Sequence, residues 1–321
     1  MRKKVLIIQP IHKSGIKLLK KEVDVILASD PSVETVCKEI KGIHGVIVRT
    51  APFTREIIES ADKLEVISRH GVGVDNIDIK AASERGIPVV HTPNANMISV
   101  AEHAIGFILA LAKRLVICDK ATREGNFAIR EEFAAVDLEG KTLGIIGAGR
   151  IGSTLAKKCK AAFNMKVLAY DPYLPPEKAR KIGANLCHNL SELLKNSDIV
   201  SIHVPFTKET KGLIGKKELG LMKHTAFLIN VARGRIVEEK ALAKALKERW
   251  IAGAASDVFS QEPVYSDNPL LKIENIILSP HMAALTKEGV IRMATGAAQG
   301  VLDVLRGNKP EYIANLDFLK K

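Results

Sequence analysis

The chain has 321 residues, of which 46% are hydrophobic and 26% charged, and its formal net charge is +12. This length suffices for two domains of ordinary size, and the composition is typical of a soluble globular protein. The lysines and arginines are spread over expected helices that also carry glutamates, and only one tryptophan and four tyrosines are available for stacking. A nucleic acid is therefore not an expected partner.

No stretch of the chain predicts a membrane segment. The longest apolar run, 104–112, is too short to span a bilayer, and residues 1–10 lack the pattern of a signal peptide. The four cysteines are scattered without a Cys-x-x-Cys pair. We therefore expect a cytoplasmic protein with reduced thiols, no contact with a membrane and no bound metal.

The first hundred residues alternate short apolar runs with polar, helix-like segments, which predicts a parallel sheet with right-handed crossovers. The expected strands are 4–8, 23–26, 45–48, 66–69 and 88–91, and the expected helices 11–20, 32–41, 54–60 and 77–85. Ligands of such sheets bind beyond the carboxyl ends of the strands.

Residues 69–78, Arg-His-Gly-Val-Gly-Val-Asp-Asn-Ile-Asp, form a loop directly after one of these strands. Gly71 and Gly73 free the backbone for a nest of N–H groups that binds an anion such as a carboxylate. The alternative is a plain turn before a helix capped by Asp75 or Asn76.

Residues 99–113 predict a helix that begins with a capping box of Ser99 and Glu102. After its first turn the helix is apolar on nearly every side, so it has to be buried all round. Burial between domains and against a second subunit satisfies this requirement, and we expect a homodimer through the 99–120 region.

Residues 141–171 predict a dinucleotide site. An apolar strand at 143–146 leads into Gly147, Gly149 and Gly152, which fit the pattern G-x-G-x-x-G, and a helix follows at 153–162. The glycines permit a tight turn and a close approach of pyrophosphate, and the helix N-terminus attracts its charge. A second strand ends on Asp171, whose carboxylate suits the ribose hydroxyls of NAD and repels the 2′-phosphate of NADP. The alternative is a glycine-rich structural turn.

The second half continues the alternation. Helices are expected at 192–195, 238–249 and 287–305, strands at 199–204, 227–230, 252–258 and 276–278, and a tail at 310–319.

Arg233, Asp257 with Glu262, and His281 each follow one of these strands. Reduction of a 2-keto acid needs a cation to bind the carboxylate and polarise the carbonyl, which suits Arg233, and a proton donor, which suits His281. Glu262 would stabilise the imidazolium, and Asp257 would accept from the nicotinamide carboxamide. The alternatives are a surface cation, a satisfied loop histidine and a solvated turn carboxylate.

Together these motifs resemble the D-isomer-specific 2-hydroxyacid dehydrogenases over nearly the whole chain. The resemblance rests on 71–76, 92–94 with 101–102, 147–152 with Asp171, 230–234, 257–259 with 262–263, and 279–281. It implies two Rossmann-like, doubly wound parallel-sheet domains: a discontinuous substrate domain of residues 1–98 and 286–321, and an NAD-binding domain of residues 99–285. Because members of this family are usually dimers, the resemblance also implies a dimer.

The resemblance implies site residues as well. The catalytic trio would be Arg233, Glu262 and His281. The residues expected around NAD are Gly147, Gly149, Arg150, Ile151, Gly152, Asp171, Val204, Pro205, Val231, Ala232, Asp257 and Ala283. The residues expected around the substrate are Arg49, Arg69, Val72, Gly73 and Arg233, with the amides of Val72 and Gly73 on the carboxylate.

The expected function is NAD-dependent interconversion of a D-2-hydroxy acid and its 2-keto acid. 3-Phosphoglycerate is a candidate substrate whose phosphate Arg49 and Arg69 could hold, and the choice of substrate stays open. The pattern resembles the phosphoglycerate-oxidising branch without its regulatory domain. His70, Arg235 and Ser256 depart from residues common in that branch. The alternatives are a glyoxylate or hydroxypyruvate reductase and, from another class, an NAD-sensing protein like the corepressors that share this fold.

Overall fold

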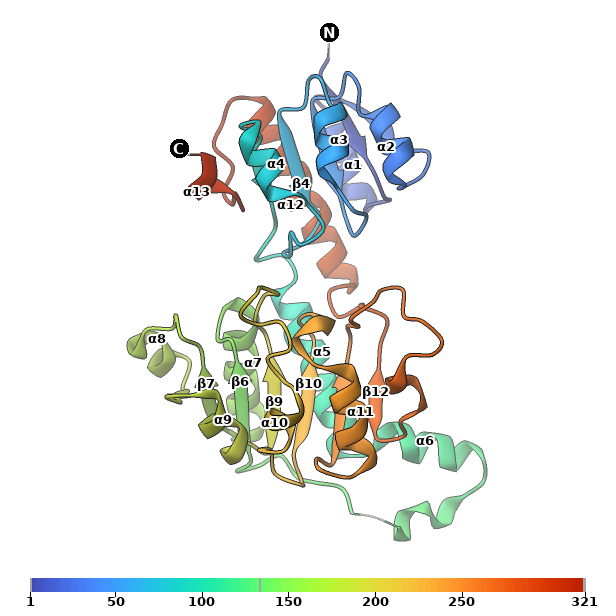
Figure 1. The fold of residues 1–321 in the computed structure, drawn as a ribbon, viewed down its shortest axis with the longest axis vertical. Helices are drawn as coiled ribbons and strands as arrows, with labels where there is room; N and C mark the ends of the chain where they lie inside the picture. The colour runs from blue at the N-terminus through green and yellow to red at the C-terminus, as the bar shows by residue number, and fades with distance from the viewer. Residues whose placement is uncertain (1, 133, 320–321) are drawn as a thin grey trace. The chain divides into compact units, whose positions relative to one another are not determined.

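The computed structural model describes residues 2–132 and 134–319. The chain divides into two compact units, Met1–Met97 with Ala284–Lys321, and Ile98–Ala283. Each unit has its own parallel sheet with packed helices (Figure 1). The expectation of two parallel-sheet α/β domains is therefore confirmed. Unit 1 is assembled from two stretches of chain that the whole of unit 2 separates in the sequence.

The sheet of unit 1 has five parallel strands in the order β2-β1-β3-β4-β5. The strands are β1 (Lys4–Ile7), β2 (Asp24–Leu27), β3 (Gly45–Val48), β4 (Val66–Arg69) and β5 (Val89–Val90). The order of strands reverses between β1 and β3. Side chains at the carboxyl ends of these two strands therefore border the position where ligands bind in doubly wound sheets.

Both faces of this sheet are covered, because alternate residues of each strand point to opposite sides. Leu6 and Ile8 belong to the core cluster on the side of α2, α3 and α4, whereas Val5 and Ile7 join Val301 of α12 on the other side. The helices of the unit are α1 (Lys13–Leu19), α2 (Val33–Glu39), α3 (Arg55–Ser60), α4 (Ile79–Glu84), α12 (Lys287–Leu305) and α13 (Leu316–Leu319). The late helix α12 thus supplies part of the core of a sheet made by the first ninety residues.

The sheet of unit 2 has seven parallel strands in the order β12-β11-β10-β9-β6-β7-β8. The strands are β6 (Thr142–Ile146), β7 (Lys166–Tyr170), β8 (Asn185–Leu186), β9 (Ile199–Ile202), β10 (Phe227–Asn230), β11 (Gly253–Ser256) and β12 (Ile276–Leu278). The order reverses between β6 and β9, so the expected ligand position lies beyond the carboxyl ends of these strands.

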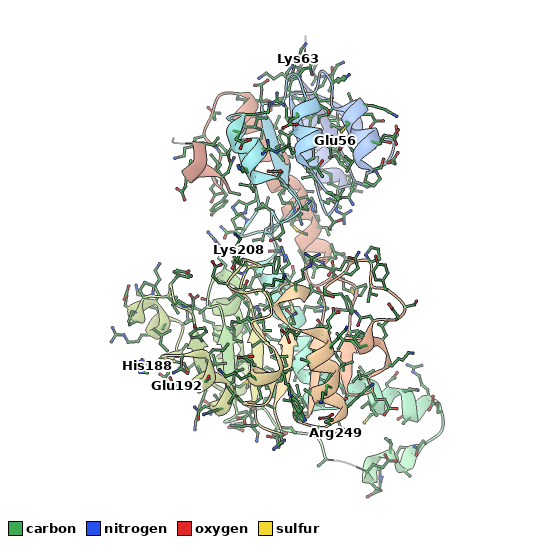
Figure 2. All side chains as sticks on the ribbon, viewed as in Figure 1. Glu56, Lys63, His188, Glu192, Lys208 and Arg249 are labelled. Carbon is green, nitrogen blue, oxygen red and sulfur yellow. The ribbon has the colours of Figure 1, made fainter. Side chains whose placement is uncertain are left out.

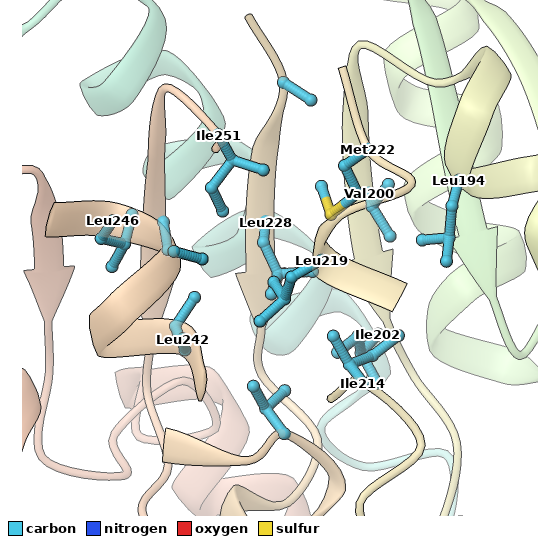
Figure 3. Close-up of a cluster of buried hydrophobic side chains, with 14 of the residues drawn as sticks. Leu194, Val200, Ile202, Ile214, Leu219, Met222, Leu228, Leu242, Leu246 and Ile251 are labelled. Atoms are coloured by element: carbon cyan, nitrogen blue, oxygen red, sulfur yellow. The ribbon is translucent and has the colours of Figure 1, made fainter. Parts of the chain in front are cut away.

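Aliphatic side chains fill one face of this sheet (Figure 3). Val200 and Ile202 of β9 and Leu228 of β10 pack with Leu242 and Leu246 of α11, and all five are at most 3% exposed. The helices of unit 2 are α5 (Met97–Ala112), α6 (Leu115–Arg123), η1 (Phe127–Glu131), α7 (Arg150–Phe163), α8 (Pro176–Lys181), α9 (Leu190–Asn196), α10 (Lys216–Leu219), η2 (Gly234–Ile236), α11 (Glu239–Lys247) and η3 (Pro269–Lys272).

Most charged side chains lie on the outside of both units. Glu56, Lys63, Lys208 and Arg249 are exposed and stand away from the ribbon (Figure 2). This distribution agrees with the sequence, in which the excess positive charge is spread along the chain rather than gathered in one run.

Two expected helix starts are wrong. Helix α5 begins at Met97, so Ser99 lies buried within the first turn and is not the N-cap of a capping box. Helix α4 is capped by Asp78, whose carboxylate accepts the N–H of Ala81 at 2.8 Å, and not by Asp75 or Asn76. The side-chain amide of Asn76 instead donates to the carbonyls of the 49–51 loop and ties it to the glycine loop.

Candidate active site

The glycine loop of unit 2 joins β6 to α7 at the reversal point of the sheet. Gly147 has a φ of +88°, and a Cβ there would lie 2.7 Å from a methyl group of Val204, which follows β9. A Cβ on Gly152 would overlap the carbonyl oxygen of Gly147. A Cβ on Gly149, by contrast, would meet nothing within 4 Å. Two glycines therefore serve the fold, whereas the third leaves open space where a pyrophosphate would approach.

The start of α7 and the end of β7 complete this cradle. Helix α7 begins at Arg150, has Gly149 as its N-cap and lacks a side-chain cap, so its positive end is open to an anion. Asp171, directly after β7, accepts the N–H of Ala148 at 3.0 Å and that of Tyr173 at 3.0 Å. These bonds fix the carboxylate beside the glycine loop, where it would meet the ribose. The residues present thus fit a dinucleotide.

The other expected cofactor residues are distributed around the same edge of the sheet. Val204 and Pro205 follow β9, and Val231 and Ala232 are buried directly after β10. Ala283 is also buried, and its N–H donates to the carboxylate of Asp257. Arg150 is exposed, and Ile151 is half-buried in the first turn of α7.

Glu262 and His281 are joined by a hydrogen bond, which becomes an ion pair when the ring is protonated. Nδ1 of His281 lies 2.6 Å from Oε2 of Glu262, and the other oxygen of Glu262 accepts the N–H of Phe259 at 3.0 Å. Burial by itself would raise the pKa of Glu262. The hydrogen bonds from His281 and Phe259, with the charges of His281 and Arg233, outweigh burial and hold that pKa below its usual value. The pair therefore presents an oriented ring next to an ionised carboxylate.

Arg233 belongs to the same group of charges. It follows β10, and its guanidinium donates to the carbonyl of Ala232 at 2.7 Å. Asn230 holds the turn, because its amide donates to the carbonyl of Arg233 at 3.0 Å and its oxygen accepts the N–H of Ala232. A Cβ on Gly234 would overlap the backbone of Phe259, so the turn after β10 and the loop that carries Glu262 fit together only with glycine there.

Asp257 is 1% exposed, and its carboxylate is surrounded by donors. One oxygen accepts the N–H of Met282 at 2.8 Å and the hydroxyl of Ser279, and the other accepts the N–H of Ala283 at 2.9 Å. The expected contact of Asp257 with a nicotinamide carboxamide stays a prediction. Its local role is to hold the backbone that follows His281.

Sequence reasoning missed His103 and Ser279. Nε2 of His103, on α5, lies 3.1 Å from Oγ of Ser279 and 3.7 Å from the carboxylate of Asp257. The sequence suggested only packing for His103. That packing exists, since its ring meets Phe107 edge-on with centroids 4.5 Å apart. The signal that marks the polar contact is a histidine on a mostly apolar helix.

Apart from Arg233, the expected substrate residues lie at or just after strand ends of unit 1. Arg49 follows β3 and donates to the carbonyl of Pro10 at 2.8 Å, next to the reversal point between β1 and β3. Arg69 ends β4, and its guanidinium donates to the carbonyl of His70 and lies over Gly71. Both guanidinium groups are close enough to the ring of His70 to act on its charge. Unit 1 therefore carries a cluster of positive charge at this edge.

The loop between β4 and α4 is the one in which an anion-binding nest is expected. Gly71 has a φ of +133°, and Thr92 both accepts its N–H at 3.1 Å and donates to its carbonyl at 3.2 Å. Nδ1 of His91 lies 3.0 Å from the carbonyl of Val72. Within residues 2–132 and 134–319, the N–H groups of Val72 and Gly73 donate to no other group. They are available to a carboxylate.

His70 is buried beside this nest. Its ring is removed from water and faces Arg49 and Arg69, which together lower its pKa to about 4, although carbonyls of His70 and Val290 favour the proton. The ring is therefore neutral at physiological pH.

Neither a metal site nor a membrane helix is present in the described residues. Among residues 2–132 and 134–319, no group of three His, Cys, Asp or Glu side chains is arranged to hold a metal ion. No helix in the described part of the chain is both long and apolar enough to cross a membrane.

Comparison with known proteins identifies the family. The sequence model of the D-isomer specific 2-hydroxyacid dehydrogenase, NAD binding domain, matches residues 105–283. A protein named D-3-phosphoglycerate dehydrogenase from Methanocaldococcus jannaschii is 43% identical over 98% of this chain. The chain spans 59% of that relative's length. A protein named glyoxylate reductase from Korarchaeum cryptofilum is 38% identical over 100% of this chain and 98% of its own.

Solved structures with similar folds cover nearly the whole chain. The TT0316 protein from Thermus thermophilus superimposes with a TM-score of 0.88 at 33% identity and covers 97% of this chain and 99% of its own. The NADPH-dependent glyoxylate/hydroxypyruvate reductase from Sinorhizobium meliloti also has a TM-score of 0.88, at 25% identity over 98% and 97% of the two chains. The chain belongs to the D-isomer specific 2-hydroxyacid dehydrogenase family, and residues 105–283 are its NAD-binding domain.

Proposed function

We propose that this protein is an NAD-dependent oxidoreductase that interconverts a D-2-hydroxy acid and its 2-keto acid. The observation that carries the proposal is the ion pair of His281 with Glu262, near the charge of Arg233 and on the sheet edge that holds the glycine loop. When bound, NAD supplies the group that takes up or gives the hydride. The protein has to orient the substrate and move one proton.

Each member of the trio has one task in this proposal. In the direction of reduction, Arg233 binds the keto acid and draws electron density toward its carbonyl oxygen. The imidazolium of His281 gives its proton to that oxygen as C2 receives the hydride. Glu262 favours the imidazolium and fixes the ring through Nδ1. In oxidation, neutral His281 removes the hydroxyl proton.

We propose 3-phosphoglycerate as the substrate. Support comes from the guanidinium groups of Arg49 and Arg69 near the nest of Val72 and Gly73. A substrate with a carboxylate at one end and a phosphate at the other needs such a nest and such cations. Two relatives, from Methanocaldococcus jannaschii and Archaeoglobus fulgidus, carry the name D-3-phosphoglycerate dehydrogenase. Reduction of glyoxylate or hydroxypyruvate is the second candidate, supported by relatives named glyoxylate reductase that match over nearly their whole length.

A substrate panel separates these candidates. Purified protein is assayed with NAD and 3-phosphoglycerate, and with NADH and either glyoxylate or hydroxypyruvate. We expect Arg49→Gln to raise KM for 3-phosphoglycerate about tenfold or more and to leave glyoxylate reduction within twofold, because only the former substrate carries a phosphate. Equal losses on both substrates contradict the phosphate assignment.

The trio is tested on whichever acid the wild type converts. Arg233→Ala and His281→Ala should each lower kcat/KM by about a hundredfold or more. Wild-type rates in both variants would remove the proposed roles and with them the proposed function.

We further propose that NAD is preferred over NADP, because the carboxylate of Asp171 would repel a 2′-phosphate. Replacing Asp171 with Ser should narrow the ratio of kcat/KM for the two cofactors by about tenfold or more. An unchanged ratio would assign the preference to another residue. The four cysteines are free thiols, which suits a cytoplasmic location.

The protein is also proposed to form a homodimer through the 99–120 region. Leu115 (53%) and Val116 (54%) of this region are exposed in the single chain, and so are Ile98 (40%) and Phe127 (70%) near its two ends. Apolar side chains gathered on one segment mark an interface.

A further inference from the structure

We propose that His103 is a positioning residue for His281, acting through Ser279 and Asp257. The inference rests on the proposed acid–base role of His281. It adds a residue outside the catalytic trio, on a helix that the sequence assigned to packing. All the groups involved lie within unit 2.

The backbone of His281 is strained. Its φ is +52°, the left-handed region that a residue with a Cβ rarely adopts. Its N–H donates to the carbonyl of Asp257 at 2.7 Å and approaches the carbonyl of Ser279 at 3.1 Å. A conformation of this kind persists only where the surroundings hold it.

Asp257 clamps the residues that follow His281. The carboxylate of Asp257 receives the N–H groups of Met282 and Ala283, one on each oxygen. Together with the bond from the His281 amide, these contacts fix three consecutive N–H groups to one residue at the end of β11. The imidazole ring is thereby held where it reaches Glu262 at 2.6 Å.

The side chains of Ser279 and His103 hold the carboxylate of Asp257 in place. The hydroxyl of Ser279 donates to the carboxylate of Asp257, so the hydroxyl oxygen accepts the hydrogen bond from the Nε2–H of His103 at 3.1 Å. The side chain of His103 is 23% exposed, and its ring packs against Phe107 of the same helix. A chain of hydrogen bonds therefore runs from α5 to the loop of His281. Nε2 of His103 therefore holds Ser279 through a hydrogen bond, which a residue that only packs would not do.

The test measures two properties of each variant: hydrogen exchange at the N–H groups of Met282 and Ala283, and the steady-state rate of the reaction. His103→Leu keeps the volume and removes the donor, whereas His103→Gln keeps an N–H group. Ser279→Ala breaks the same chain one residue later. Ile108→Val is the matched control, because Ile108 is fully buried on the same helix and has no polar group.

In the protein without ligands, His103→Leu should speed hydrogen exchange at the N–H groups of Met282 and Ala283 about tenfold. With NADH and glyoxylate or 3-phosphohydroxypyruvate, it should lower kcat about tenfold while KM for NADH stays within twofold, because the acid–base group is misplaced and the cofactor cradle is intact. His103→Gln should stay within threefold of the wild type, and Ile108→Val should lower only the melting temperature.

A double variant sharpens the result. His103→Leu combined with Ser279→Ala should lose no more kcat than the more damaging single variant, because both break one chain. Multiplied losses overturn the inference, as do wild-type exchange and kcat in His103→Leu, or a His103→Gln variant as slow as His103→Leu.

Failure of the proposed function can be told apart from failure of the proposed role of His103. An active His281→Ala variant would remove the acid–base role of His281, whereas the exchange experiment reports on the clamp alone.

Discussion

The lowered pKa of Glu262 bears on the protonation of its partner His281. Its pKa lies below the usual value because the bonds from His281 and Phe259 outweigh the effect of burial. A depressed pKa means that the carboxylate stays ionised at pH values where an ordinary glutamate is already protonated, and that it loses its charge only as the pH falls through the lower, folded value. The partner that the imidazolium needs is thus present throughout the neutral range.

Removing this charge should change the pH dependence of the reaction. Glu262→Gln leaves a group of similar shape without the negative charge, so the protonated ring loses its partner. The pH range in which the 2-keto acid is reduced should shift down by about one unit, and kcat at pH 7.5 should fall about tenfold or more. Profiles of kcat against pH for wild type, Glu262→Gln and the exposed-carboxylate control Glu177→Gln provide the measurement. Superimposable profiles would contradict it.

His70 should make unit 1 sensitive to acid. Its pKa is about 4 in the folded protein and 6.5 in the reference state. The unfolded chain therefore binds more protons between these values, and the stability that the neutral ring contributes is complete above pH 6.5 and lost as the pH falls through 4. The difference corresponds to about 3 kcal/mol.

Chemical denaturation between pH 7 and pH 4 should therefore show a smaller loss of unfolding free energy in His70→Gln than in the wild type. The exposed His188 provides the control variant His188→Gln, whose slope should match that of the wild type. Parallel slopes for all three proteins would show that the proton uptake lies elsewhere.

At the level of residues, the sequence predicted site residues where a charged side chain directly follows a predicted strand. Arg233, Glu262 and His281 were predicted because charged residues after parallel strands share one edge of a sheet. His103 and Ser279 could not be predicted, because 176 positions separate them in the chain and only the packed fold brings them together.

Among the elements, the turn from β6 into α7 separates glycines that serve the fold from one that serves the ligand. In the protein without ligand, Gly152→Ala should lower the unfolding free energy by roughly 1–3 kcal/mol, because the new methyl overlaps the carbonyl of Gly147. Gly149→Ala should change it by less than about 0.5 kcal/mol, because the methyl meets nothing.

The same pair should differ in cofactor binding. Gly149→Ala should weaken NAD binding about tenfold or more, since the methyl occupies the open space that a pyrophosphate would need. Thermal unfolding and titration calorimetry of the two variants measure both quantities. A Gly149→Ala variant with wild-type affinity would mean that the phosphates do not approach this glycine.

The order and type of the long elements followed from the sequence, but the break between α5 and α6 did not. The break is made by Arg114, which adopts a φ of +53°, and neither glycine nor proline marks the position. The short helix α8 and the two-residue strand β8 were likewise missed. Their apolar content is too small to show a period, and neighbouring elements decide their structure.

At the scale of the whole molecule, the proposed dimer predicts how the exposed apolar segment behaves. Sedimentation of the wild type at micromolar concentration should give twice the monomer mass. Val116→Glu and Phe127→Ser should each shift the equilibrium toward the monomer, because burying a charge or losing an aromatic anchor weakens an apolar interface. Tyr173→Ser is the control, since Tyr173 is 91% exposed and lies outside the segment. A monomeric wild type would contradict the dimer.

The position of α12 has a consequence for the protein during its synthesis. The strands of unit 1 are complete near residue 90, but α12, which covers Val5 and Ile7, begins only at Lys287. At ~5–20 residues per second, a ribosome needs on the order of 10–40 s to make the ~190 residues in between. During that interval only α1 covers this face of the nascent sheet, and the part that α12 will bury stays exposed. The unit whose strands are made first is therefore the last to be completed.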